Sequence, residues 1–172
     1  MEPQIRVLNE EDAGDLFKLR RGALLESPSA FLASPNDDLA SSDDAVRALL
    51  KRGPESVVLG VGTAALIGML GLHRHTQTTK AAHKATLWGM FVLPQWRRRG
   101  LGARLLAAAI GYARGLEGVA TVQLSVNESA TAARHLYETA GFTVWGVEPD
   151  AMRIHGRSER EHHMALSLEL RP

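Results

Sequence analysis

Hydrophobic residues recur along this chain with two periods, and the change between them divides it into strands and helices. Short runs that are apolar throughout, or that alternate apolar and polar residues, are typical of strands. Such runs occupy residues 4–8, 57–61, 65–72, 86–93, 122–126, 142–147 and 164–170. Apolar residues three and four positions apart predict helices. Helices are expected from Asn9 to about Glu26, between Ser42 and Gly53, from Gly100 to Arg114 and from Ser129 to Ala140.

Local signals at the ends of these segments agree with the periodicity. Asn9, Ser42 and Ser129 stand where a side chain would cap the start of a helix. Gly141 stands where a glycine commonly ends one. Gly89 interrupts a predicted strand and suggests a bulge or a close backbone approach. The polar stretches are predicted to be loops, and they cover residues 27–36, 73–84 and 149–160.

The order of the predicted elements, β-α-α-β-β-β-α-β-α-β-β, indicates an α/β fold. We expect a mixed, mostly antiparallel sheet of six to seven strands with helices on both faces. The chain of 172 residues contains no repeat, low-complexity segment or linker. It is therefore expected to form one domain over residues 1–172.

The composition narrows the possible chemistry. Because no cysteine is present, disulfides, a thiolate nucleophile and thiolate metal ligands are excluded. The formal net charge is only +1, which does not suggest a nucleic-acid-binding protein. Residues 1–12 are mixed and acidic, without the basic start and apolar core of a signal peptide. With no apolar run long enough to span a membrane, the expected location is the cytoplasm.

The stretch from Met90 to Leu106 carries the strongest functional signal. A predicted strand stops at Pro94, three arginines follow, and two glycines open a predicted helix. A glycine turn at a helix start exposes backbone N–H groups at the positive end of the helix dipole, where phosphates bind. An anionic, nucleotide-like ligand is therefore expected. A kinase-type P-loop is disfavoured because no Lys-Ser/Thr pair follows the glycines. A solvated basic face and a nucleic-acid patch in which Trp96 stacks are the alternatives.

Two motifs resemble those of the GNAT superfamily, the acyl-CoA-dependent N-acyltransferases. Residues 97–102, RRRGLG, are similar to that family's phosphate-binding motif, and the strand before them ends in Val-Leu-Pro, as in the family. Residues 136–142, LYETAGF, resemble its last motif, with Tyr137 in the tyrosine position. The resemblance covers essentially the whole chain. More loosely, residues 155–166 resemble a subgroup that acetylates phosphinothricin and other amino compounds.

The resemblance implies acetyl-CoA as co-substrate and a set of residues that hold it. The backbone of a splayed central strand would pair with the pantetheine arm, and one N–H group would face the thioester carbonyl. The glycine turn and its arginines would bind the pyrophosphate. Ala130 stands where the family often has an asparagine, and Asn127 lies three residues earlier. The expected cofactor-binding residues are Met90, Phe91, Val92, Arg97, Arg98, Arg99, Gly100, Leu101, Gly102, Ala103, Arg104 and Asn127.

Two catalytic roles follow from the resemblance. Tyr137 would protonate the leaving thiolate as a general acid. By pattern alone it lies on the apolar face of its helix, as core tyrosines do. The acceptor amine also needs a base. His83, just before the central strand, is the best-placed candidate, and His73, Glu26 or a water chain are the alternatives.

The predicted function is transfer of an acetyl group from acetyl-CoA to a primary amine of a small molecule or peptide, by direct attack in a ternary complex. A non-catalytic acyl-CoA-binding regulatory module is the alternative. The acceptor is expected between Leu24–Phe31, His73–His83 and Glu148–Glu161, but Arg160 stands where the subgroup usually has an aspartate. A homodimer through the edge of the last strands is left open. Neither nucleic acid nor a membrane is expected as a partner. No metal is expected from His155, His162 and His163, which alternate between the two faces of a predicted strand.

Overall fold

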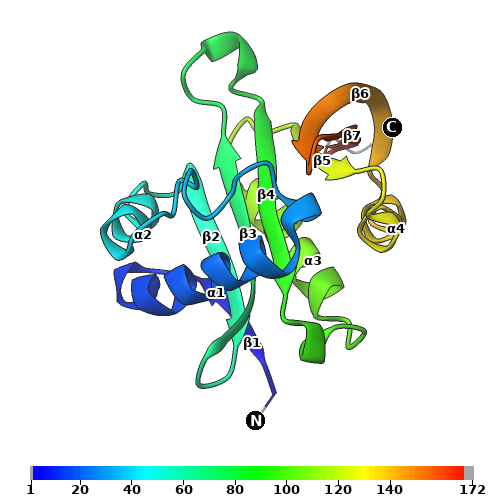
Figure 1. Ribbon diagram of the computed structural model, residues 1–172. Helices are drawn as coiled ribbons and strands as arrows, with labels where there is room; N and C mark the ends of the chain where they lie inside the picture. Colours follow the sequence, from blue (N-terminus) through cyan, green and yellow to red (C-terminus); the bar gives the residue numbers. More distant parts are fainter. Residues whose placement is uncertain (1, 169–172) are drawn as a thin grey trace.

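A seven-stranded sheet forms the centre of the computed structural model, which describes residues 2–168 (Figure 1). The strands run in the order β1-β2-β3-β4-β5-β7-β6. Their bounds are β1 Gln4–Val7, β2 Ser56–Gly62, β3 Leu66–Arg74, β4 Lys84–Val92, β5 Thr121–Asn127, β6 Thr143–Ile154 and β7 Arg157–Ser167. The α-helices are α1 Ala13–Glu26, α2 Asp43–Leu50, α3 Leu101–Gly115 and α4 Thr131–Thr139. The predicted mixed α/β fold is therefore confirmed.

Helices cover both faces of the sheet, and each face has its own hydrophobic core. In Figure 1, α1 and α2 lie in front of the sheet and α3 lies behind it. Leu16 and Leu24 of α1 and Val46 of α2 pack in the front core. Leu105 and Ile110 of α3 pack in the rear core with residues of the strands. Helix periodicity in the sequence therefore corresponds to real buried faces.

The sheet opens between β4 and β5. These strands are the one parallel pair within residues 2–168, and their pairing is limited to Lys84–Thr86 against Thr121–Gln123. Because β4 continues to Val92 and β5 to Asn127, the two strands separate beyond that short ladder. The central strand is thus splayed from its neighbour, as expected.

The prediction of a loop over residues 149–160 is wrong. β6 continues through the first half of that stretch to Ile154, and His155 and Gly156 turn the chain directly into β7, which begins at Arg157. Both turn residues have positive φ, at 50° and 77°, which suits a tight hairpin turn. Polar side chains occupy both faces of this hairpin, so no apolar alternation marked the strands. The last residues of the predicted final strand, including Leu170, lie outside the described range.

Two of the three predicted helix caps are confirmed. Asn9 caps the 3-10 turn Glu10–Asp12 that leads into α1, and the Ser42 hydroxyl accepts a hydrogen bond from the Ala45 N–H. Ser129 does not cap α4, which begins two residues later without a side-chain cap. Its hydroxyl instead donates to Oδ1 of Asn127, at 2.6 Å. The Ser129 hydroxyl therefore takes part in a local turn with Asn127 instead of capping the helix.

β6 forms one outer edge of the sheet, and Trp145 on it is exposed. A homodimer through this edge stays a prediction. No helix within residues 2–168 has the length and hydropathy that a membrane span requires.

Candidate active site

A bulge in β4 marks the centre of the candidate site. Met69 pairs with Phe91 and Gly71 with Trp88, so the single residue Leu70 faces both Gly89 and Met90. Gly89 has φ +68°, a conformation that side chains with a Cβ rarely adopt. A Cβ there would lie 3.1 Å from Nη1 of Arg20 and 3.2 Å from Cε of Met69. The backbone conformation calls for glycine and the space around it is tight, and the predicted bulge is confirmed.

Backbone groups beyond the bulge face the opening in the sheet. Met90, Phe91 and Val92, the residues expected to pair with pantetheine, lie past the last β4–β5 pair. The carbonyl of Val92 accepts a hydrogen bond from Nε of Arg97, at 2.8 Å. The rest of this edge is unpaired by β5, which leaves room for an extended chain to bind along it.

The glycine turn leads directly from β4 into α3. Gly100 has φ +75° and caps the helix without a side-chain hydrogen bond. Within the described part of the chain, the N–H groups of Gly100, Leu101, Gly102 and Ala103 donate to no protein acceptor. A Cβ on Gly100 would meet nothing within 4 Å. These open donors at the positive end of a helix dipole suit a phosphate group.

The four arginines around this turn divide into two kinds. Arg97 binds Glu26 at 2.9 Å, and Arg104 binds Glu2 at 3.2 Å. Arg98 and Arg99 form no ion pair with the residues that the structure describes. The guanidinium of Arg99 lies 4.9 Å from the ring centre of Trp96. Arg98 and Arg99 are therefore the cations best able to bind an anion, whereas Arg97 links the turn to α1 through its ion pair with Glu26.

Tyr137 lies on α4 and is only 7% exposed. Its ring packs edge-on against Phe142, with 6.0 Å between ring centres. Burial raises the pKa of Tyr137 to about 12. No protein group in residues 2–168 forms a hydrogen bond with its hydroxyl. The phenol is therefore protonated across the ordinary pH range and has a donor to offer.

Asn127 ends β5 and is buried. Its Oδ1 accepts hydrogen bonds from the N–H and the hydroxyl of Ser129, at 2.8 and 2.6 Å. The side-chain carbonyl thus shapes the turn from β5 into α4. Its expected contact with the cofactor stays a prediction.

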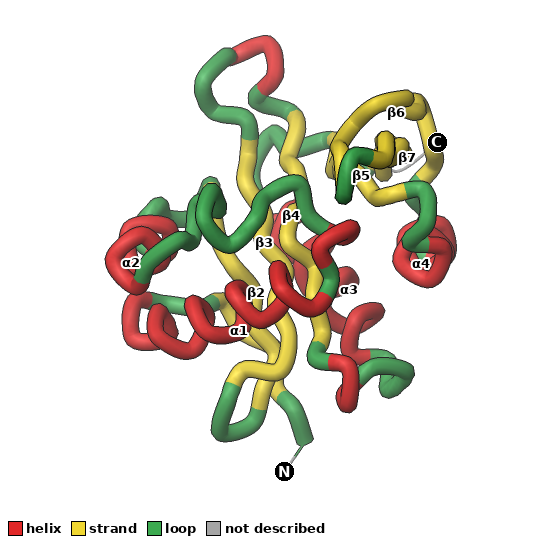
Figure 2. Tube along the Cα trace, viewed as in Figure 1, coloured by secondary structure: helices red, strands yellow, loops and turns green. Residues whose placement is uncertain are grey.

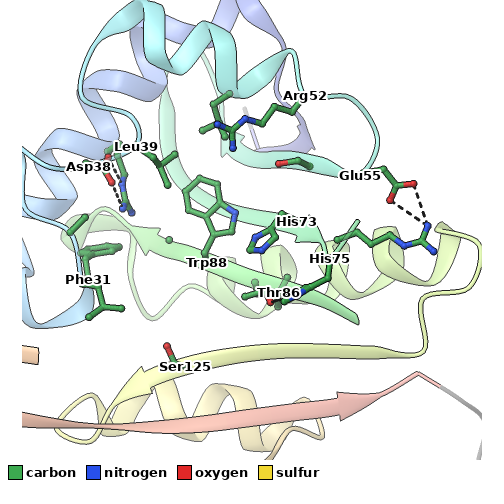
Figure 3. A pocket seen from close by; sticks show the side chains of 18 of the residues that line it. Phe31, Asp38, Leu39, Arg52, Glu55, His73, His75, Thr86, Trp88 and Ser125 are labelled. Carbon is green, nitrogen blue, oxygen red and sulfur yellow. Dashed lines mark hydrogen bonds and ion pairs between the residues drawn. The ribbon is translucent and has the colours of Figure 1, made fainter. Parts of the chain in front are cut away.

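A cleft of about 1240 Å³ lies on the front face beside the bulge (Figure 3). The connection between α1 and α2 crosses in front of β3 and β4 and forms one wall (Figure 2). The remainder comes from α2 and the start of β2, from the end of β3 and the loop after it, from the middle of β4, and from single residues of β5 and β7. Lining residues include Arg20, Phe31, Asp38, Arg52, Glu55, His73, Arg74, His75, Thr86, Trp88, Gly89, Ser125 and Glu161.

The candidate bases are placed very differently. His83 is exposed and lies outside the residues that line the cleft. Glu26 accepts hydrogen bonds from Ser27 and Arg97, which hold its pKa below the usual range. His73 lines the cleft, and its pKa is lowered by burial, then by the charges of His75 and Arg52. Of these residues, His73 is the one that presents a neutral side chain to the cleft.

The sequence interpretation missed a buried ion pair under this cleft. Arg20 of α1 binds Asp38 through two hydrogen bonds, Nε to Oδ2 at 3.0 Å and Nη2 to Oδ1 at 2.8 Å. Its guanidinium lies 4.7 Å from the ring centre of Phe31 and 5.7 Å from that of Trp88. One feature of the sequence could have indicated this pair: Arg20 follows Leu19 on the apolar face of α1, where a charged residue needs a partner.

The donor set at the start of α3 fits a pyrophosphate, because several N–H groups in succession are open and no side chain fills the space at Gly100. With the β4 edge open beside it, the fold and site define the class of acyl-CoA-dependent acetyltransferases. A sequence comparison agrees with this class. The family model "Acetyltransferase (GNAT) family" matches residues 21–142, and the chain belongs to that family. Acetyl-CoA is the acyl donor of this family.

Two curated relatives are mycothiol acetyltransferases. The protein from Salinispora tropica is 39% identical over 82 residues, which is 46% of this chain and 26% of that protein. The protein from Salinispora arenicola is 43% identical over 60 residues, which is 35% of this chain and 20% of that protein. The chain therefore spans about a quarter or less of the length of these relatives.

Solved structures with the same fold cover the whole chain. A GNAT-family acetyltransferase from Streptococcus pneumoniae has a TM-score of 0.86 at 21% identity, covering 98% of this chain and 100% of its own. The protein yncA from Salmonella typhimurium, solved with its cofactor acetyl-CoA, has a TM-score of 0.84 at 20% identity. That match covers 100% of this chain and 97% of yncA. At these identities the likeness shows the fold alone.

Among the described residues, no group of three or more His, Asp or Glu side chains is arranged to hold a metal ion.

Proposed function

We propose that the protein transfers an acetyl group from acetyl-CoA to a primary amine by direct attack within a ternary complex. One observation carries this proposal: the front cleft reaches Gly89, in the same strand whose open edge leads to the free N–H groups of α3. An acceptor in the cleft and an acyl donor along that edge would meet where β4 and β5 separate. The direct route suits this chain because it has no cysteine to form an acyl-enzyme.

The residues that would hold acetyl-CoA follow from the open donors. The N–H groups of Gly100 to Ala103 bind the pyrophosphate, and Arg98 and Arg99 add charge. The backbone from Met90 to Val92 pairs with the pantetheine arm. Acetyl-CoA supplies a reactive thioester carbonyl, and a backbone N–H near the bulge donates to its oxygen as negative charge develops there.

The acceptor must lose a proton before it attacks, because an alkylamine has a pKa of about 10.4. His73 is our candidate for the group that receives this proton, since its lowered pKa keeps it neutral near pH 7. Its weak basicity means that the proton passes on to solvent through the open cleft. The amine nitrogen then forms the new C–N bond as the C–S bond breaks, and loss of a second proton leaves the amide.

Tyr137 is our candidate for the proton donor to the leaving sulfur. A thiol with a pKa of about 8.5 lies about 3.5 units below a phenol with a pKa of about 12. Complete transfer to a free thiolate would therefore be uphill by about 5 kcal/mol. The phenol therefore acts chiefly through its hydrogen bond to the sulfur, which strengthens as the C–S bond breaks and negative charge accumulates there.

Replacing Tyr137 by phenylalanine tests this function. Steady-state acetylation of a panel of primary amines is followed by release of free thiol, and acetyl-CoA affinity is measured by titration. We expect kcat to fall by about 10²-fold or more, with acetyl-CoA affinity unchanged. Tyr112→Phe is the matched control, because the Tyr112 hydroxyl binds the Pro54 carbonyl on the surface at 3.0 Å. That variant should keep its activity.

Two results would count against the proposal. Full activity of Tyr137→Phe would remove the tyrosine from the mechanism. Tight acetyl-CoA binding by the wild type with no turnover of any amine would instead favour a non-catalytic acyl-CoA-binding module.

A further inference from the structure

The guanidinium of Arg20 has one nitrogen without a partner. Asp38 occupies Nε and Nη2, whereas Nη1 is buried and forms no hydrogen bond with any described residue. Arg20 is only 5% exposed, and it lines the cleft where Nη1 lies against the Gly89 bulge. The aromatic rings of Phe31 and Trp88 stack on the guanidinium but offer no acceptor in its plane. Buried N–H donors of this kind normally have an oxygen partner.

A second charged group without a protein partner lines the same cleft. Glu161 of β7 is 6% exposed, and no group in residues 2–168 forms an ion pair or hydrogen bond with its carboxylate. Glu161 is in register with Asn127, and alternate residues of a strand share a face, so its side chain lies on the same side as Ser125. Figure 3 shows Ser125 across the cleft from Phe31, Asp38 and Trp88. Glu161 therefore lies on the wall that faces Arg20.

The other charged groups of the cleft either have a protein partner or are exposed to water. Arg74 and Glu55 bind one another at 3.2 Å. Asp37 and Arg52 are exposed, so water solvates them. Among the described residues, the cleft thus presents an unsatisfied, buried guanidinium nitrogen on one wall and an unpaired carboxylate on the facing wall.

We propose that the acceptor carries a carboxylate as well as its amine, with the carboxylate on Nη1 of Arg20 and the amine on Glu161. This inference rests on the proposed acetyl transfer and names its acceptor class as amino carboxylates. The ligand carboxylate supplies the acceptor that Nη1 lacks, and its amine pairs with the free carboxylate of Glu161. Both residues are specificity determinants, because neither takes part in bond making.

Matched pairs of amino acids and their carboxamides test the proposal, from glycine and glycinamide up to 6-aminohexanoate and its amide. Within the preferred pair, the wild type should show kcat/KM at least about tenfold higher for the acid. Arg20→Lys keeps a charge for Asp38 but loses Nη1, so the preference should collapse. Glu161→Gln should raise KM for both members of the pair by a similar factor and keep the ratio. Arg52→Gln, at the exposed rim, is the control and should also keep the ratio.

Stability is checked by thermal unfolding, and Arg20→Met/Asp38→Leu replaces Arg20→Lys if the latter does not fold. Equal use of acids and amides by the wild type would overturn the inference while leaving acetyl transfer intact, and so would a preference that survives loss of Nη1. If no amine is acetylated, the proposed function fails instead. In that case the binding of each acid and each amide is measured by calorimetry in the presence of CoA. Selective binding of the acids that is lost in Arg20→Lys supports the inference about the acceptor, and any other pattern overturns it.

Discussion

Replacing Gly89 by alanine should damage both the fold and the site, because the added methyl group would crowd Arg20 and Met69 and the backbone conformation is unsuited to a Cβ. Gly89 has φ +68°, and a residue with a Cβ in this conformation is strained by about 1–2 kcal/mol. The Cβ would also lie 3.1 Å from Nη1 of Arg20 and 3.2 Å from Cε of Met69. Arg20 cannot easily move because it is held by Asp38 through two hydrogen bonds. Overpacking of this kind costs about 1–3 kcal/mol.

The two contributions together lower the free energy of unfolding by about 2–5 kcal/mol. For a chain of this size each kcal/mol corresponds to about 2–4 °C in Tm, so Tm should fall by on the order of 10 °C. Displacing Nη1 and the bulge by a few tenths of an ångström should also reduce kcat/KM for acetyl transfer by about tenfold. Thermal unfolding followed by circular dichroism measures the first effect, and thiol release below the transition measures the second.

Gly111→Ala is the matched control. Gly111 lies within α3, is exposed, and a Cβ there would meet nothing within 4 Å. Alanine in a helix interior is favoured over glycine by about 0.5–1 kcal/mol, so this variant should be slightly more stable and fully active. If Gly89→Ala matched wild type in Tm and in kcat/KM, the bulge would not require glycine and would not position the site.

Three further predictions follow from the same contacts. Gly100→Ala should raise KM for acetyl-CoA at a stability cost of about 1–2 kcal/mol, because the backbone is strained at φ +75° while the space around it is open; an unchanged acetyl-CoA titration would contradict this. Burial lowers the pKa of His73 in the folded chain below the value of about 6.5 expected in the unfolded chain. The stability gained by keeping this side chain neutral is therefore complete above about pH 6.5 and is lost as the pH falls toward the pKa of the folded state. Tm should therefore fall less between about pH 7.5 and 5.5 in His73→Gln than in the wild type; equal losses would show that His73 does not titrate in this way. Arg20→Met should lower the free energy of unfolding by about 3–5 kcal/mol because it leaves Asp38 buried and uncompensated, and Asp38→Leu in the same chain should recover most of this loss; chemical denaturation compares the two, and equal losses in both variants would refute the explanation.

Local sequence signals predicted the part of the site that is local in the chain. Strand β4, the turn at Gly100 and helix α3 follow one another without interruption, so periodicity, a glycine and a helix start sufficed. Gly89 was recognisable for the same reason, since a glycine inside an apolar run indicates a bulge. The distal half of the β6–β7 hairpin, residues 149–160, was predicted as a loop because both of its faces carry polar residues, which removes the alternation that identifies a strand.

Tertiary structure decided what the cleft contains. Arg20 and Asp38 are 18 residues apart, and only the folded chain shows that they pair and leave Nη1 unsatisfied. Glu161 reaches the cleft because β7 lies beside β5, an adjacency that no local pattern encodes. His83 precedes the central strand as expected, yet sequence proximity does not fix the direction of a side chain, and the residue lies outside the cleft. The sequence by itself thus determined the strand, bulge and glycine turn of the proposed acyl-CoA site, because each depends on neighbouring residues. The acceptor side depends on strand order and on charges brought together from distant elements, so only the fold could assemble it.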